Sequence, residues 1–229
     1  MHVASTTDRI HDRAAELGPA SFGVVGDLTV ESDVDRLLAA VGHVDVLVNN
    51  AGMVSIGAPD QVGPVTTTSY AEWRADLARN LDTAFLVTRR FLPAMVAAGW
   101  GRVVNIGSIA SLTGGPYIAA YTAAKHGLLG LTRALAAEWV RAGITVNLVA
   151  PGYVDTAMTD ATVENIARRT GRAEAESRAV VEAFSPQRRL VAVEEIVPLV
   201  RLLVGDEAAS ITGAVLPIDG GASAFPAKG

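Results

Sequence analysis

The sequence predicts an α/β protein built on a doubly wound parallel sheet. Short apolar runs alternate with longer amphipathic runs along the 229 residues, which is the pattern of strand–helix–strand units. Half of the residues are apolar, enough for a sizeable core. Turns that contain Gly or Asn follow several apolar runs, and such turns gather at the ligand-binding edge of a parallel sheet.

The N-terminal half contains three predicted strands and three predicted helices. Within the second helix, Val34, Leu37 and Val41 share one side. Pro93 is expected to kink the third helix or to divide its last turns. The predicted elements are strand His2–Ser5, helix Thr7–Leu17, strand Phe22–Val25, helix Glu31–Val41, strand Val44–Val48, a loop over 53–69 and helix Tyr70–Ala98.

The C-terminal half continues the alternation, with one interruption. Residues 153–189 are more polar than the rest of the chain and carry a cluster of Arg and Glu residues. We interpret 153–189 as a lobe of short helices that covers a substrate, with an ordinary solvated surface as the alternative. The chain length favours one domain over residues 1–229. The predicted elements are strand Arg102–Ile106, helix Ala119–Ala142, strand Ile144–Val149, helix Val193–Val204 and strand Ala214–Ile218.

Composition argues against several functions. The net charge of −5 offers no basic surface for nucleic acid or an anionic membrane. No run of ~18 uncharged apolar residues predicts a membrane span. The chain has no cysteine, which excludes disulfides and thiolate chemistry and fits a reducing cytoplasm. The four histidines are scattered without metal-ligand spacing, so we expect no metal site.

Tyr121 and Lys125 form the first candidate catalytic pair. They lie in Tyr-Thr-Ala-Ala-Lys, and residues four apart on a helix share a face. A nearby ammonium stabilises a phenolate and lowers the pKa of the tyrosine, as a proton donor to a carbonyl oxygen requires. Taken alone, the pair is more typical of a tyrosine at the edge of the core beside a surface lysine.

Ser108 and Asn80 strengthen the catalytic interpretation. Ser108 follows the strand over 102–106 and precedes Tyr121 by 13 residues, a position where a hydroxyl can orient a substrate oxygen. A turn serine is the plain alternative for Ser108, and Ser111 is the alternative candidate for its role. Asn80 lies inside a predicted helix although Asn is a poor helix former, which indicates either a polar role or a solvent-facing position.

With these four residues, the chain resembles the classical short-chain dehydrogenase/reductase family over nearly its whole length. The resemblance implies a Rossmann-like fold and reversible hydride transfer between a nicotinamide cofactor and an alcohol/carbonyl pair. It implies that Tyr121 is the general acid/base and that Lys125 lowers its pKa and holds the cofactor ribose. It also implies that Ser108 orients the substrate oxygen and that Asn80 holds a water of a proton relay.

The same resemblance implies which residues contact the cofactor. Asp27 lies near the adenine, Asn49 on the adenosine side, and Val154 and Thr156 near the nicotinamide. The alternatives are an ordinary turn Asp, a strand-bracing Asn and a Pro-Gly turn without a ligand. The full set is Asp27, Asn49, Ala51, Gly52, Tyr121, Lys125, Pro151, Gly152, Val154 and Thr156.

The family's phosphate-binding turn, Thr-Gly-x-x-x-Gly-x-Gly, does not occur in the sequence. Roughly 30 residues of strand and helix would carry it, and that strand would lie between the strands that begin near His2 and Val44. We therefore expect the fold to lack its first strand and helix, which leaves two strands without a neighbour. Either the natural protein begins earlier, or this form is genuine and is a non-catalytic binding or scaffold protein.

The expected function is oxidation and reduction of a small-molecule alcohol/carbonyl pair. A 3-oxoacyl-thioester reductase, such as one acting on acyl-carrier-protein substrates, is the runner-up. Ser5 stands where an acidic residue would favour NAD, and Arg9 is nearby, so NADP is preferred with NAD as the alternative. The resemblance also implies a homo-oligomer, either a dimer or a tetramer.

We predict that the 229-residue chain binds NADPH and NADH weakly, because it has no Gly-rich turn to offer backbone N–H groups to a pyrophosphate. Isothermal titration calorimetry with each cofactor measures this directly. Micromolar binding of either cofactor would contradict the prediction and show that another segment holds the phosphates.

Overall fold

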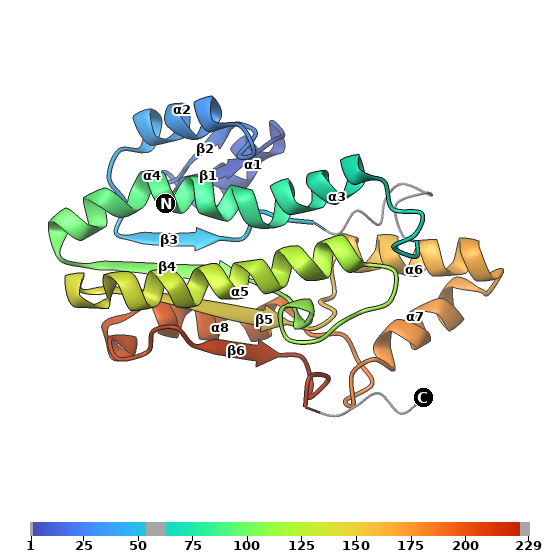
Figure 1. Cartoon of the computed structure of the whole chain (residues 1–229). Helices are drawn as coiled ribbons and strands as arrows, with labels where there is room; N and C mark the ends of the chain where they lie inside the picture. Colours follow the sequence, from blue (N-terminus) through green and yellow to red (C-terminus); the bar gives the residue numbers. More distant parts are fainter. Residues whose placement is uncertain (1, 54–62, 225–229) are drawn as a thin grey trace.

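Two parallel sheets form the framework of the molecule. The computed structural model describes residues 2–53 and 63–224. One sheet has two strands in the order β1-β2, and the other has four in the order β3-β4-β5-β6 (Figure 1). The strands are β1 (His2–Ser5), β2 (Phe22–Val25), β3 (Val46–Asn49), β4 (Gly101–Ile106), β5 (Ile144–Pro151) and β6 (Val215–Ile218).

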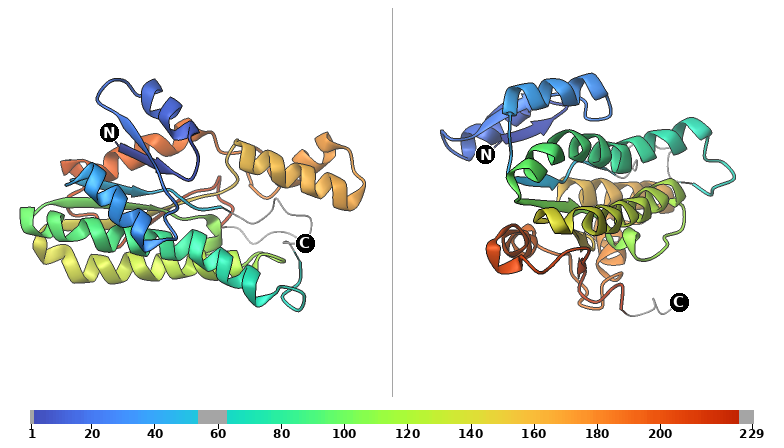
Figure 2. Two further views of the ribbon diagram at one scale, coloured as in Figure 1. Left: turned by 90° about the horizontal axis from the view of Figure 1, so that it is seen from above. Right: turned by 60° about the vertical axis from the view of Figure 1, so that its left-hand side comes forward.

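Helices cover the four-stranded sheet on both faces. α4 and α5 lie on one face and α8 on the other, while α6 and α7 stand beyond the carboxyl ends of the strands (Figures 1 and 2). The helices are α1 (Arg9–Glu16), α2 (Glu31–Val41), α3 (Tyr70–Leu77), α4 (Thr83–Ala98), α5 (Ala119–Trp139), α6 (Ala157–Thr170), α7 (Glu174–Glu182) and α8 (Val193–Val204). None of the helices in the described ranges is both long and apolar enough to cross a membrane.

The core forms because alternate residues of the central strands face opposite helices. Val103 of β4 packs with Met95 of α4 and with β5, whereas its neighbour Val104 packs with Leu203 of α8. All eight residues of β5 are buried. The central strands are therefore covered on both sides, each side by its own layer of helix.

The predicted helix over 70–98 is three segments in the structure. A capping box between Ser69 and Glu72 begins α3. The backbone then widens to a π-helical segment, Ala78–Asp82, before α4 continues to Ala98. The expected division at Pro93 is wrong, because α4 runs through that proline without a break. The irregularity lies instead around Asn80, and π-helical turns of this kind are frequent at functional sites.

Other boundaries differ by a few residues from those predicted. β3 begins at Val46, because Val44 leaves the strand and packs between two core clusters. Helix α1 begins at Arg9, two residues after the predicted start. The lobe over 153–189 does consist of short helices, α6 and α7. Most of the predicted loop over 53–69 lies outside the described residues.

The sheet is interrupted where the sequence predicts a missing strand. Within the described residues, no ladder joins β1 to β3. The two sheets are instead held together by a shared core cluster, in which Val34 of α2 and Phe91 of α4 pack against residues of β1, β2 and β3. One face of β3 stays open to solvent as a result, and Val48 is 41% exposed.

This exposure predicts a contrast between two valines in strands. Val48→Thr should change the free energy of unfolding by at most about 0.5 kcal/mol, because its side chain already contacts water. Val104→Thr should cost about 1–3 kcal/mol, because Val104 is 0% exposed and the new hydroxyl would be buried. Urea denaturation of dilute protein measures both. An equal cost at the two positions would show that β3 is covered in solution.

Candidate active site

The structure brings Asn80, Ser108, Tyr121 and Lys125 together at the carboxyl end of the four-stranded sheet. Tyr121 and Lys125 lie one turn apart on α5 and are 8% and 5% exposed. The Lys125 Nζ is 5.7 Å from the centroid of the Tyr121 ring. Ser108 follows the end of β4, and its side chain is a hydrogen-bonding partner of Tyr121. The spacing noted in the sequence therefore corresponds to a spatial cluster.

Lys125 is a buried cation with one hydrogen bond to the sheet. Its Nζ donates to the backbone carbonyl of Ile106 over 3.1 Å. Burial disfavours the charged ammonium and lowers the pKa of Lys125 from 10.5 to about 8. The side chain is therefore close to its own titration point under physiological conditions.

Asn80 places an unsatisfied acceptor beside this lysine. Its Nδ2 donates to the backbone carbonyls of Met53 (2.8 Å) and Asp76 (3.0 Å). Its Oδ1 is buried and accepts no hydrogen bond from the described residues. A Cβ built on Gly52 would lie 2.9 Å from that oxygen and 3.4 Å from the Lys125 Nζ. Gly52 is needed here because any side chain would fill the space between the two groups.

The pKa of Tyr121 differs from the sequence-based expectation. Burial raises it, hydrogen bonding by Ser108 lowers it, and the nearby Tyr153 and Asp76 raise it further. The net effect is a raised pKa for Tyr121. The expectation that Lys125 lowers this pKa is therefore wrong for the protein without a bound cofactor. Tyr121 is a protonated phenol at neutral pH.

Two participants were missed by sequence reasoning. Asp76 is 9% exposed and lies one helical turn before Asn80. This spacing of four residues was the signal in the sequence that could have identified Asp76. Its charge disfavours the Tyr121 phenolate. The electrostatic contact between Tyr153 and Tyr121 was missed as well, because it joins the end of β5 to α5 through tertiary structure alone.

The structure separates the roles of the two candidate serines. Ser111 is 0% exposed, and its Oγ accepts a hydrogen bond from the Ser108 backbone N–H over 3.2 Å. The Ser108 Oγ accepts from the Ala110 N–H over 3.1 Å and remains half-buried. Ser111 therefore supports the turn, while Ser108 is the serine that reaches Tyr121.

Asn49 braces the sheet. Its Nδ2 donates to Thr88 Oγ1 (2.9 Å) and to Asn105 Oδ1 (2.8 Å), and Asn105 donates in turn to Thr132. This chain of side chains joins β3, β4, α4 and α5. The bracing alternative is thus confirmed for the Asn49 amide, and Ala51 and Gly52 follow it toward the cluster.

Asp27 lies apart, beyond the end of β2 in the two-stranded sheet. Its Oδ1 accepts hydrogen bonds from the backbone N–H (2.9 Å) and hydroxyl (2.7 Å) of Thr29. These bonds lower the pKa of Asp27. The contacts are those of a turn-forming Asp, and they leave its exposed carboxylate ionised.

The segment after β5 enters the lobe. The Gly152 N–H donates to the Ile218 carbonyl over 2.9 Å, which places this turn beside β6 immediately after Pro151. Val154 forms an isolated parallel bridge with Val191. Thr156 then precedes α6, and its hydroxyl is exposed. The expected cofactor residues Val154 and Thr156 therefore lie at the entrance of the lobe.

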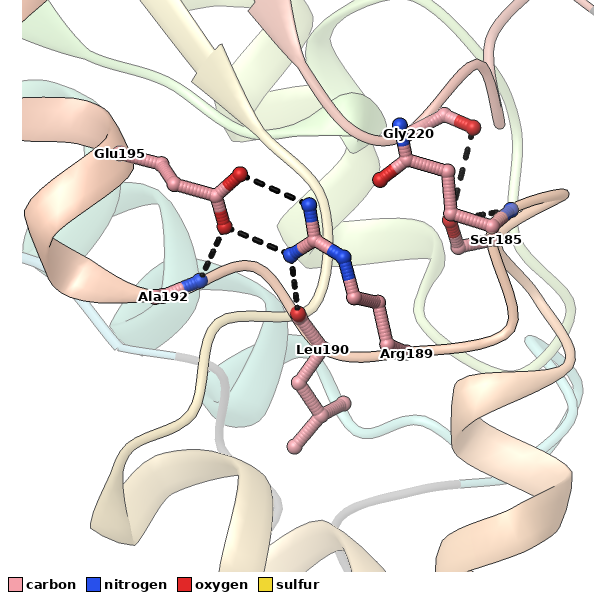
Figure 3. A network of polar contacts seen from close by, with 7 residues as sticks. Ser185, Arg189, Leu190, Ala192, Glu195 and Gly220 are labelled. Carbon is pink, nitrogen blue, oxygen red and sulfur yellow. Dashed lines mark hydrogen bonds and ion pairs between the residues drawn. The ribbon is translucent and has the colours of Figure 1, made fainter.

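The exit from the lobe is held by a polar network (Figure 3). Arg189 forms two hydrogen bonds with Glu195 of α8, at 2.6 and 2.8 Å. The Glu195 carboxylate also accepts from the Ala192 N–H, and its partners lower its pKa to about 2. Ser185 donates to the Gly220 carbonyl over 3.5 Å. Both ends of the lobe are thereby fixed to the sheet and to α8.

No group of three or more potential metal ligands occurs in the part of the chain that the structure describes.

Comparisons with known proteins match nearly the whole chain. The family described as enoyl-(acyl carrier protein) reductase matches residues 2–223. A D-beta-hydroxybutyrate dehydrogenase of Rhizobium meliloti is 35% identical over 223 residues, covering 93% of this chain and 84% of the relative. A 3-oxoacyl-(acyl-carrier-protein) reductase of Escherichia coli is 36% identical over 200 residues, covering 87% of this chain and 75% of the relative.

A solved structure gives the same result in three dimensions. A variant of actinorhodin polyketide ketoreductase with NADPH superimposes with a TM-score of 0.87 at 32% identity. The superposition covers 97% of this chain and 86% of that one. The predicted α/β fold is confirmed.

The burial of Lys125 predicts a pH-dependent stability difference. At pH 7 both states carry the proton, so the folded protein bears the cost of burying the charge. Between pH about 8 and 10.5 the folded state has lost the proton and the unfolded chain still holds it, so stability rises with pH. Lys125→Met should therefore raise the free energy of unfolding by about 1–3 kcal/mol at pH 7, and this gain should shrink across that window.

Urea denaturation at pH 7, 9 and 10 tests the difference. Arg133→Met, which removes an exposed cation from the same helix, is the control and should show a flat difference. A Lys125→Met variant that is less stable than the parent at pH 7 would contradict the prediction.

Proposed function

This chain belongs to the classical short-chain dehydrogenase/reductase family, and from that premise we propose the roles of its residues in catalysis. The protein is an NAD(P)-dependent oxidoreductase that interconverts an alcohol and a ketone or aldehyde. The observation that carries the proposed roles is the buried pair Tyr121 and Lys125, with Ser108 beside the tyrosine and Asn80 beside the lysine.

The residues at the reacting end fit a nicotinamide cofactor. Gly52 keeps open the space beside Lys125, and a ribose hydroxyl placed there would meet both an ammonium donor and the unsatisfied Asn80 Oδ1. Thr156 precedes the N-terminus of α6, where a phosphate is stabilised by the helix dipole and by free N–H groups. When bound, the nicotinamide supplies or accepts the hydride.

Tyr121 is the general acid in the direction of reduction. The raised pKa keeps its phenol protonated at neutral pH, so a proton is available for the carbonyl oxygen. Ser108 donates a second hydrogen bond to that oxygen and fixes its position. Oxidation of the alcohol needs the Tyr121 phenolate instead. The rate of oxidation should therefore increase relative to the rate of reduction as the pH rises.

Lys125 and Asn80 return the proton to Tyr121. A Lys125 pKa of about 8 allows the side chain to take up and release a proton near neutral pH. The unsatisfied Asn80 Oδ1 is suited to bind a relay water, because buried acceptors are normally hydrogen-bonded. The route then leads from solvent through Asn80 and Lys125 to Tyr121.

We further propose NADP as the preferred cofactor, on the basis of Ser5 and Arg9 at the end of β1. On the adenosine side, the proposed contacts are Asp27, Asn49 and Ala51. At the nicotinamide, they are Pro151, Gly152, Val154 and Thr156. The described residues contain no Gly-rich phosphate-binding turn, so the pyrophosphate is the part of the cofactor with least support from this chain.

Two alternative functions remain, each with its own support. Reduction of a 3-oxoacyl thioester is favoured by the Escherichia coli relative, whose name specifies that substrate. A non-catalytic binding protein is favoured by the interrupted sheet and the absent Gly-rich turn. Measurable turnover of carbonyl compounds separates both enzyme functions from the binding protein.

We propose a cytoplasmic homo-oligomer, either a dimer or a tetramer, that acts as one domain with 153–189 as its substrate-covering lobe. The absence of cysteine supports the compartment. The half-exposed Phe85 on α4 supports self-association through the long helices. Sedimentation equilibrium gives the mass, and a monomer at micromolar concentration would contradict the oligomer.

Tyr121→Phe tests the catalytic assignment. It keeps the ring and its packing and removes the proposed proton donor, so kcat should fall by about 10²–10⁴-fold. Cofactor affinity should stay nearly unchanged. The assay follows NADPH oxidation with a panel of carbonyl compounds, at cofactor concentrations above the measured Kd.

Tyr117→Phe is the control, because Tyr117 is an exposed tyrosine just before α5 and should retain full activity. Turnover by Tyr121→Phe within a few-fold of the parent would contradict the role of the tyrosine. A parent without turnover on any carbonyl compound would contradict the enzyme function itself.

A further inference from the structure

A second tyrosine, Tyr153, follows the end of β5 and lies close enough to Tyr121 to interact with it electrostatically. It lies two residues beyond Pro151, and its backbone carbonyl accepts a hydrogen bond from the Val191 N–H over 2.8 Å. Tyr153 interacts electrostatically with Tyr121 and disfavours ionisation of the Tyr121 phenol. The side chain is largely buried, and burial raises the pKa of Tyr153. It is therefore a neutral phenol with a proton to donate.

Among the residues that the structure describes, the Tyr153 hydroxyl has no hydrogen-bond partner. No hydrogen bond joins it to any residue within 2–53 or 63–224. The hydroxyl oxygen is also not fully buried, so it retains some contact with solvent. Tyrosine hydroxyls that are largely buried normally find a hydrogen-bond partner. An unpaired phenol beside the general acid therefore indicates a partner that arrives with the substrate.

Phe184 packs against the Tyr153 ring. The two ring centroids are 5.5 Å apart with a tilt of 31°. Phe184 directly precedes Ser185, whose side chain bonds to Gly220, and Arg189 further along bonds to Glu195 (Figure 3). The aromatic pair is thus held by the same network that anchors the lobe. A donor on a fixed ring can discriminate between substrates, because it cannot turn away to find another partner.

We propose that the Tyr153 hydroxyl donates a hydrogen bond to a second oxygen of the substrate, and that it selects carbonyl compounds with another oxygen acceptor near the reacting carbonyl. The class of substrate is the carbonyl compound with a second oxygen acceptor, rather than the simple ketone. This inference rests on the proposed function, because it takes Tyr121 as the group that meets the reacting oxygen. Tyr153 is a specificity-determining residue of that reaction.

Two substrates of similar length test this role. Methyl acetoacetate carries the second oxygen, and 2-hexanone lacks it. The parent should favour methyl acetoacetate in kcat/KM. Tyr153→Phe should reduce that preference by about tenfold or more, the size expected for a hydrogen bond left unmade in a buried site. Its kcat/KM for 2-hexanone should stay within about threefold, because the ring and its contact with Phe184 remain.

The control is Tyr70→Phe, which removes a hydroxyl from an exposed tyrosine at the start of α3 and should change neither substrate. An equal loss with both substrates, or an unchanged preference, would overturn the proposal. If the parent turns over neither compound, the proposed function fails, and ligand-detected NMR decides this inference separately. There, Tyr153→Phe should raise the Kd of methyl acetoacetate and leave that of 2-hexanone unchanged; equal effects overturn it.

Discussion

The hydrogen bond from the Lys125 ammonium to the Ile106 carbonyl is the contact on which the active site depends. Burial of the Lys125 charge is costly, and this bond, which forms where α5 meets the end of β4, offsets part of that cost. Tyr121 lies one turn earlier on the same helix, and Ser108 lies two residues beyond the same carbonyl. The groups that we propose as the acid, the cation and the orienting hydroxyl therefore lie around one contact.

A second set of polar contacts explains why this arrangement survives an interrupted sheet. Two consecutive side-chain hydrogen bonds connect Asn49 of β3 to Asn105 of β4, and Asn105 to Thr132 of α5. The strands nearest the site are therefore joined by side chains as well as by their backbone hydrogen bonds. The two-stranded sheet contributes no hydrogen bond to this network. It is attached through apolar contacts with α2 and α4, and these can hold it without fixing the site.

The sequence predicts the strands and the catalytic spacing because both are local properties. Alternation and apolar spacing identify β1, β2 and α2 to the residue, and a separation of four residues on a helix brings Lys125 to the face of Tyr121. Pro93 and Asn80 show where prediction from local sequence fails. Helix packing keeps α4 continuous through the proline, and the backbone widens at the asparagine, because tertiary contacts override local preference there. The rise in the Tyr121 pKa depends on burial, which no spacing reveals.

The bridge between Val154 and Val191 means that the chain enters and leaves the lobe through one pair of neighbouring residues. The segment from α6 to α7 lies between these two residues, and the contacts of Ser185 with Gly220 and of Phe184 with Tyr153 anchor it further. We expect changes of length inside the lobe to leave Tyr121 and Lys125 in place as long as these anchoring contacts are kept. In evolutionary terms, the lobe would then be an exchangeable module, and its proposed role over the substrate would let substrate range diverge while the chemistry stays constant.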